Sequence, residues 1–324
     1  MSQSIQPPAI PLAVRSPYLQ SYLPHTSTTE QSNLWPNFWT TNHILGCTGL
    51  VRVDNALYTW LGQPGSLMLN NGTKLNNAAF NGYQVTPTRS ILRLTAGNMN
   101  INASSNDENS HSVQVYQDIT GEWLSKSNDV TNIMQRNTTA VQNTTTLYHE
   151  AQRLPFQFIE ENDMAEDGVV YHVTNTLCFW SQGSAVTYES GEDTILRRSG
   201  FLKNGTLPNT QDTMNRAISE QANFLVLFAA VLLCILSRWP VLAFSSDLRN
   251  ITSTSTSSPL VWGIGLVRSP DIIYATTTGN QTRRPYFFTK YGSGGVPAAM
   301  VDFMSDAQNA LQRSINLDNA LLLC

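Results

Sequence analysis

Apolar and polar residues alternate along most of this chain, and the alternation predicts short β-strands. Residues 90–94 (Ser-Ile-Leu-Arg-Leu) and 112–116 (Ser-Val-Gln-Val-Tyr) repeat with a period of two, as strands with one buried face do. Residues 44–53 and 56–61 flank the pair Asp54-Asn55, whose side chains tolerate the positive φ angles of a tight hairpin turn. A β-hairpin is therefore predicted around this pair.

Further short strands are predicted at residues 144–151, 169–173, 185–189 and 261–267. Gly, Pro, Asn and Ser clusters separate these segments. Many short strands between turn signals are typical of sandwiches, so the predicted fold class is mainly β, an antiparallel β-sandwich.

The two ends of the chain differ from this pattern. Residues 1–30 are Pro-rich and aperiodic, which indicates an extended segment lying over a domain formed by residues 31–300. From residue 301 apolar positions recur at helical spacing, with Ser305 as the expected N-cap. Residues 301–324 are therefore predicted to start a C-terminal helical region.

One apolar run, residues 224–236, interrupts the strand pattern. Its thirteen uncharged residues are fewer than the roughly 20 that a membrane-spanning helix needs. Extension to Phe244 reaches the required length but includes Arg238 and Pro240, a charge and a helix breaker. A membrane span is kept as an alternative explanation of this run.

Composition narrows the functional classes. Of the 324 residues only 13% are charged, 41% are hydrophobic, and the formal net charge is −4. Such a chain has no basic field for a phosphate backbone, which excludes nucleic-acid binding, and its spread of aromatic residues argues against disorder.

Seven Asn-x-Ser/Thr sequons favour a glycosylated, extracellular surface, although an Asn- and Thr-rich chain also forms some by chance. They are Asn71, Asn102, Asn137, Asn143, Asn204, Asn250 and Asn280. The first residues of the chain lack the basic and apolar stretches of a signal peptide. On the sequons, and despite this missing signal, secretion is predicted for the parent protein, with membrane attachment as the alternative.

No catalytic constellation is legible in the sequence. The five histidines, His25, His43, His111, His149 and His172, are scattered singly and are interpreted as strand or surface residues. Cys47 lies in a strand context that favours a small buried role, and Gly263-Ile264-Gly265 is interpreted as strand sequence rather than a phosphate loop. No catalytic residue, cofactor or metal site is predicted.

Two groups of residues are expected to contact another domain. One is the acidic cluster Glu160, Glu161, Asp163, Glu166 and Asp167, which lacks the Asp/Asn alternation of a calcium loop. The other comprises Trp35 and Trp39. The simpler interpretation of the acidic cluster is a solvated loop, and that of the two tryptophans is packing in the core.

Several blocks of sequence occur in the order found in one fungal family. They are residues 7–19 (PPAIPLAVRSPYL), 35–40 (WPNFWT), 49–54 (GLVRVD), 58–62 (YTWLG), 111–116 (HSVQVY) with 122–123 (EW), 160–168 (EENDMAEDG) and 207–212 (LPNTQD). On these blocks the chain resembles the fungal glutaminase A family.

The resemblance implies a two-part protein in which a β-sandwich precedes a C-terminal helical toroid of the six-hairpin kind. It implies extracellular hydrolysis of L-glutamine to glutamate and ammonia as the activity of the whole. This chain is expected to be the N-terminal accessory domain, to end as a linker helix begins, to be inactive alone, and to have the missing toroid as its partner.

The chain also departs from the family pattern. The block at residues 216–218 is followed in relatives almost directly by the Trp-Pro-Val motif found here at residues 239–241. The seventeen residues between Gln221 and Trp239, residues 222–238, include the apolar run and are interpreted as a retained intron. A glycoside-active or glycan-binding protein and a membrane-tethered binding module remain alternatives to the accessory domain.

Overall fold

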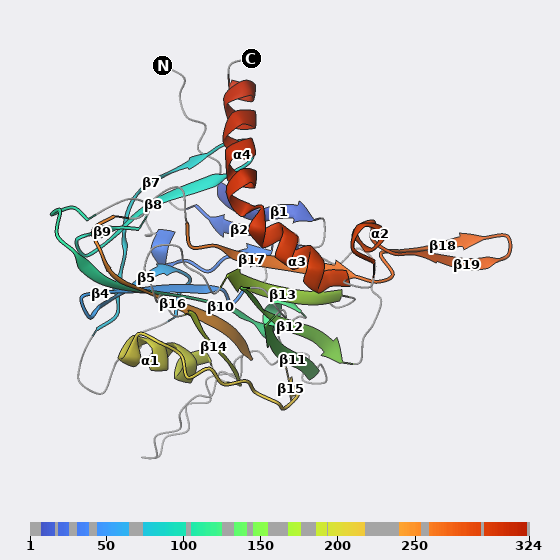
Figure 1. Cartoon of the computed structure of the whole chain (residues 1–324), viewed down its shortest axis with the longest axis horizontal. Helices are drawn as coiled ribbons and strands as arrows, with labels where there is room; N and C mark the ends of the chain where they lie inside the picture. The colour runs from blue at the N-terminus through green and yellow to red at the C-terminus, as the bar shows by residue number, and fades with distance from the viewer. Residues whose placement is uncertain are drawn as a thin grey trace.

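The structure is a computed structural model, and it shows a mainly β protein built on two packed antiparallel sheets with few helices (Figure 1). It describes residues 8–16, 19–25, 31–38, 44–64, 74–101, 105–124, 133–140, 145–154, 168–175, 186–192, 194–217, 240–253, 259–292 and 295–322. The predicted fold class, mainly β and antiparallel, is confirmed.

The larger sheet has six strands. Their order is β14 (Val186–Gly191), β16 (Val241–Ile251), β10 (His111–Thr120), β4 (Thr48–Val53), β5 (Ala56–Leu61) and β6 (Asn76–Asn77). The predicted hairpin is confirmed as β4–β5, whose turn residues Asp54 and Asn55 have φ angles of 48° and 69°. Strand β6 pairs with β5 in parallel, whereas β14, β16, β10, β4 and β5 pair with one another antiparallel.

The second sheet has five strands and faces the first. Their order is β15 (Arg216–Ala217), β11 (Ile133–Ala140), β12 (Thr146–Leu154), β13 (Gly168–Asn175) and β17 (Trp262–Arg268). Ile119 and Leu242 of the six-stranded sheet meet Ala151 and Val170 of the five-stranded sheet in one buried core. The short strands predicted from the alternating pattern are therefore present as β8 (Ser90–Ala96), β10, β12, β13, β14 and β17.

Three smaller sheets surround this core. They are β1 (Ala9–Ser16), β2 (Leu19–Pro24) and β3 (Asn37–Phe38); β7 (Ala79–Val85), β8 and β9 (Met99–Asn100); and the hairpin β18 (Ile272–Thr276) and β19 (Gly279–Arg283). The β18–β19 hairpin projects from the body as an arm (Figure 1). Its strand β19 is exposed along its whole length.

Helices cover the outer faces of both main sheets. Helix α1 (Thr194–Asn204) packs on the six-stranded sheet through Phe201 and Leu202, and α3 (Gly295–Ser305) packs on the five-stranded sheet through Met300 and Met304. Helix α2 (Phe287–Tyr291) lies beside α3, and α4 (Ala307–Leu322) follows it. Two short 3-10 helices are η1 (Gln31–Asn33) and η2 (Gly121–Trp123).

The predicted C-terminal helical region is present, but its predicted start is wrong. Ser305 is the last residue of α3, and its Oγ donates to the carbonyl oxygen of Asp302 at 2.9 Å. The backbone N–H of Asp306 also donates to Asp302 O, and Ala310 N–H donates to Asp306 O. Because helical hydrogen bonding continues through this turn, Ser305 does not act as an N-cap.

The apolar run at 224–236 and the interpreted insertion at 222–238 lie outside the described residues. Within the described part, no helix has the length and apolarity to cross a membrane. The last four residues of the possible span, 241–244, begin strand β16 and are buried in the sandwich.

Candidate interaction groove and buried polar clusters

An open groove of about 790 Å³ lies between the outer face of the five-stranded sheet and helices α2 and α3. Strands β13 and β17 form its floor, where Tyr171 pairs with Gly265 and Val173 pairs with Gly263. Successive side chains of a strand point to opposite faces of the sheet, so residues two apart lie on the same face. Gly263 and Gly265 are two residues apart, and both lie on the face that lines the groove. The floor is therefore strand backbone beside the ring of Tyr171.

The two glycines have different surroundings. A Cβ placed on Gly263 would lie 2.7 Å from Cγ1 of Val173, 3.4 Å from Phe303 and 3.6 Å from the sulfur of Met304. Among the residues that the structure describes, a Cβ placed on Gly265 would meet no atom within 4 Å. Gly263 thus permits α3 to approach the sheet, whereas the space over Gly265 stays open.

The walls of the groove are mainly apolar and aromatic. They include Phe287 and Tyr291 from α2 and Val296, Met300 and Phe303 from α3. Phe303 is 62% exposed, which is unusual for a side chain of this size. The phenolic pKa of Tyr171 is raised by burial and by the neighbouring Glu150 carboxylate, so the ring on the floor stays neutral.

The charged groups at the rim are paired with one another. Lys290 Nζ lies 2.6 Å from Oδ2 of Asp302, which also accepts from the hydroxyl of Tyr291. The hydrogen bond from Lys290 lowers the pKa of Asp302. Asp306 is bound by the guanidinium of Arg313. The rim therefore presents compensated ion pairs.

The layer under α1 is closed and strongly polar. The Arg198 guanidinium binds both carboxylate oxygens of Asp118 at 2.7 and 2.9 Å, and the side chains are 3% and 0% exposed. Asp118 also accepts from the hydroxyl of Tyr116 and from the backbone N–H of Thr48. Burial lowers the pKa of Arg198, but the Asp118 carboxylate more than offsets this, and the net shift is upward.

Two histidines lie in the interior between the sheets. The ring of His149 stacks on Phe244 with centroids 4.4 Å apart, and its Nε2 donates to the carbonyl oxygen of Ala243 at 3.0 Å. Burial lowers the pKa of His172, which holds that ring neutral. Cys47 is also buried, and burial raises the pKa of its thiol. The buried role predicted for Cys47 is confirmed, although Cys47 lies just before β4, and His149 and His172 lie on strands as interpreted but are buried rather than at the surface.

A third histidine, His111, lies between two carboxylates at the β4–β5 turn. Its Nδ1 is 2.5 Å from Asp54 Oδ2 and its Nε2 is 2.9 Å from Asp107 Oδ1. The pKa of His111 is raised most by the hydrogen bond to Asp54 and further by the hydrogen bond to Asp107. Hydrogen bonding from His111 lowers the pKa of Asp107 to about 2. This cluster ties the hairpin turn to the start of β10.

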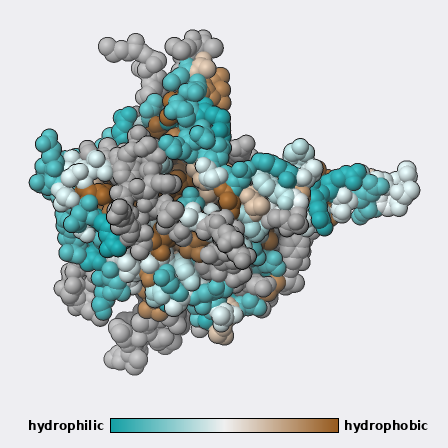
Figure 2. All heavy atoms as spheres, viewed as in Figure 1, coloured by the Kyte–Doolittle hydropathy of each residue, from teal (hydrophilic) through white to brown (hydrophobic). Residues whose placement is uncertain are grey.

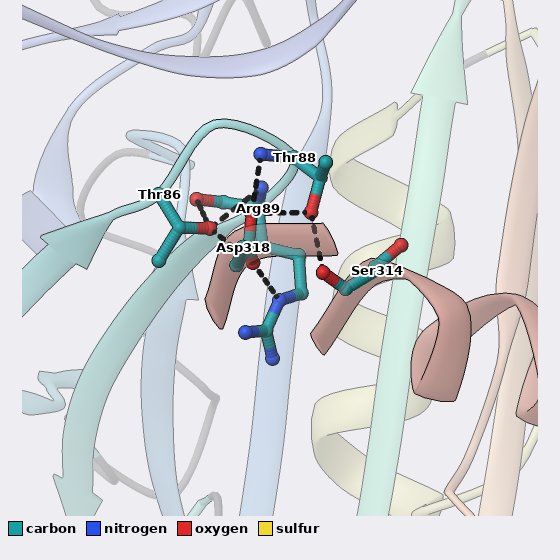
Figure 3. A network of polar contacts seen from close by, with 5 residues as sticks. All are labelled: Thr86, Thr88, Arg89, Ser314 and Asp318. Atoms are coloured by element: carbon teal, nitrogen blue, oxygen red, sulfur yellow. Dashed lines mark hydrogen bonds and ion pairs between the residues drawn. The ribbon is translucent and has the colours of Figure 1, made fainter. Parts of the chain in front are cut away.

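Helix α4 is anchored to the β7–β8 turn through Asp318, as Figure 3 shows. The Asp318 carboxylate accepts from Thr86 Oγ1 at 2.8 Å, Thr88 Oγ1 at 2.8 Å, Thr88 N–H at 3.0 Å and Arg89 Nε at 2.9 Å. Asp318 is only 1% exposed. No sequence pattern predicts this contact, because its partners are more than 200 residues apart along the chain.

The predicted contact residues fall in different places. Trp35 is half-buried, and the guanidinium of Arg198 lies 5.6 Å from the centre of its ring. Trp39 and all five acidic residues, Glu160, Glu161, Asp163, Glu166 and Asp167, lie outside the described residues. Within the described part, no group of three or more His, Cys, Asp or Glu side chains is arranged to hold a metal ion.

The sequons also divide. Asn204, Asn250 and Asn280 are exposed, and Asn280 lies on the β18–β19 arm. Asn137 lies on β11, whose side chains are not described, and Asn71, Asn102 and Asn143 lie outside the described residues.

Comparison with known proteins matches residues 94–322 to a family described as a domain of unknown function, DUF5127. The chain belongs to this family. The matched part contains α1, the groove and α4. The groove and the helices on both outer faces therefore lie within the part of the chain that matches the DUF5127 model.

Two fungal proteins are similar to this DUF5127 chain. Glutaminase A of Aspergillus oryzae is 29% identical over 98% of the chain and 44% of its own length. A probable glutaminase of Arthroderma benhamiae is 26% identical over 67% of the chain and 28% of its own length. The resemblance to the glutaminase A family is confirmed, and the chain spans less than half the length of either relative.

Proposed function

We propose that this chain is the β-rich accessory domain of a secreted, glutaminase-type amidohydrolase whose catalytic groups lie in another region. The observation that carries the proposal is the coverage: 98% of the chain aligns with a glutaminase A, yet it accounts for 44% of that protein. The proposed partner is the remainder of such a protein, expected to be a helical toroid.

The roles of the nucleophilic and basic side chains support this assignment. Glutamine hydrolysis is acyl transfer, which needs an activated nucleophile or water, a base and donors for the oxyanion. His149 and His172 are buried between the sheets, His111 is held by two carboxylates, and the Cys47 thiol is buried with a raised pKa. Each of these groups contributes to the framework rather than facing the groove.

Secretion and N-glycosylation are part of the proposal. The exposed sequon residues Asn204, Asn250 and Asn280 are open to an oligosaccharyltransferase, and a glycan on each would point into solvent. Mass spectrometry of protein secreted by a fungal host, with and without glycosidase treatment, tests this assignment. Unmodified peptides at all three asparagines would contradict it.

The function is tested at the transcript and then in solution. The cDNA is sequenced through codons 215–245 and past codon 324, and the encoded protein is produced beside the 324-residue chain. Ammonia release from L-glutamine is expected from the longer protein and not from the chain alone. Ammonia release by the purified chain would contradict the proposal, as would a transcript that encodes nothing beyond it.

A further inference from the structure

We propose that the groove over Gly265 is the docking site for an apolar polypeptide segment from the region that the longer relatives carry outside the matched part. This inference rests on the proposed function and names the surface by which the accessory domain would contact the rest of the protein. A segment bound there would leave the packing of the sandwich unchanged, because the groove lies outside the core between the two sheets.

The first argument is the presence of glycine at position 265. Glycine inside a strand weakens the strand and often marks a place where another backbone or a ligand approaches closely. Gly263 meets this rule within the chain, because α3 packs against it. Gly265 lies two residues later on the same strand face, and a Cβ there would meet no atom of the described residues within 4 Å. The group that Gly265 accommodates is therefore not among the residues that the structure describes.

The second argument is the chemistry of the groove. Its walls carry Phe287, Met300 and Phe303, and its rim charges are paired as Lys290–Asp302 and Arg313–Asp306. Paired charges give no net field to attract a phosphate or another ion. Apolar walls with a few polar groups at the rim suit an uncharged occupant with apolar side chains.

The third argument is that the helices beside the groove carry further exposed apolar side chains. Phe303, Leu317 and Leu321 are 62%, 50% and 51% exposed. Figure 2 shows apolar surface over α3 and near the C-terminal end of α4, with polar surface between the two areas. Interfaces between domains of one chain are typically of about 600–1,500 Å² with an apolar centre, and exposed apolar side chains on two neighbouring helices fit such a partner.

The occupant is identified by the lengths of the relatives. Glutaminase A of A. oryzae aligns with 98% of this chain and has more than half of its own length outside the aligned part. The groove and α4 lie within the part shared by the family. We therefore assign the groove, which lies within the matched residues, to the polypeptide that the longer relatives carry outside the alignment.

The test uses matched leucine substitutions at two glycines. Gly265→Leu fills the groove, and Gly200→Leu is the control on α1; at both positions a Cβ would meet no atom of the described part of the chain within 4 Å. A second pair removes apolar surface of equal exposure: Phe303→Ser at the groove and Leu196→Ser on α1, both side chains being 62% exposed in the wild type. Circular dichroism and thermal unfolding establish that each variant is folded.

The probe is the unaligned remainder of A. oryzae glutaminase A, produced as a separate polypeptide and titrated against each variant by calorimetry. Gly265→Leu and Phe303→Ser are expected to weaken binding by at least about tenfold, as loss of a central contact does, and the α1 controls to leave it unchanged. Equal binding by Gly265→Leu and wild type would overturn the proposal.

Two further outcomes also contradict the proposal. One is the absence of binding between the wild-type chain and the remainder. The other is binding of a mixed oligosaccharide panel that Gly265→Leu abolishes, which would assign the groove to a glycan. Neither outcome bears on ammonia release by the protein of the complete transcript, so failure of this inference is distinguishable from failure of the proposed function.

Discussion

The two outer faces of the sandwich are both covered by a helix, but in opposite ways. Under α1 the Arg198–Asp118 pair is fully enclosed, and Phe201 packs on Tyr116 with ring centroids 5.0 Å apart. Under α3 the strand β17 presents glycines, and a groove of about 790 Å³ stays open. The side chains under α1 are buried and have their partners within the chain. The groove under α3 is open and resembles one side of an interface with another polypeptide.

Loss of the buried cation should break the closed layer. Arg198→Met leaves the Asp118 carboxylate buried without its counter-charge, and breaking a buried pair in this way costs about 3–5 kcal/mol. Arg249→Met is the control, because Arg249 is 55% exposed and its contact with Asp247 is worth no more than about 1 kcal/mol. Urea unfolding of both variants measures the difference, and equal midpoints would remove the contrast.

Alanine substitutions at the two glycines sharpen the contrast within the groove itself. Gly263→Ala places a methyl group 2.7 Å from Val173, and such overpacking costs about 1–3 kcal/mol. The methyl group of Gly265→Ala meets no atom within the described ranges, so this variant should change the free energy of unfolding by no more than about 1 kcal/mol, in the stabilising direction. If the two variants lose equal stability, the space over Gly265 is filled.

Anchoring of α4 depends on the Asp318 carboxylate. Asp318→Asn keeps the shape of the side chain but removes the charge that Arg89 and Thr88 bind. We expect faster amide exchange at Thr88 and in the last turns of α4, with exchange in α1 unchanged. Hydrogen–deuterium exchange with mass spectrometry measures both regions, and unchanged exchange at Thr88 would show that α4 is held by other contacts.

The His111 cluster gives the smallest expected effect, a dependence of stability on pH. The pKa of His111 is raised in the fold, so its contribution is fully present below its ordinary value of 6.5 and is lost as pH rises through the folded pKa. Asp107 has a folded pKa of about 2 instead of 3.8, so its contribution is present above pH 3.8 and is lost as pH falls toward 2. Both contributions are therefore largest between about pH 4 and 6.5.

The variant His111→Asn checks this pH dependence. Its urea midpoint should vary less than that of the wild type above pH 6.5, where the wild type loses the contribution of the charged imidazole. Identical pH profiles for the two proteins would mean that the carboxylates do not hold the histidine in solution.

Local patterns predicted the strands, and long-range contacts escaped prediction. The β4–β5 hairpin follows from Asp54-Asn55 alone, because the turn geometry is set by two adjacent residues. The Arg198–Asp118 pair joins residues 80 apart in sequence, and no spacing rule connects them. Helix α1 carries Gly200 in its middle and has little helical signal, so its position is set by packing on the sheet.

The groove shows the same limit. Gly263 and Gly265 were correctly assigned to a strand, but the difference between them arises only when α3 packs over one and not the other. The N-cap predicted at Ser305 failed for a related reason. The turn through Asp306 keeps helical hydrogen bonds that the sequence pattern does not specify.

Hydrogen–deuterium exchange of the chain, alone and with the unaligned remainder of A. oryzae glutaminase A, tests the contrast between the two layers most directly. We predict slower exchange in α2, α3 and β17 when the remainder is present, with exchange in α1 and β14 unchanged. Protection confined to the α1 layer, or no protection in either layer, would contradict the assignment of the open layer as the docking face.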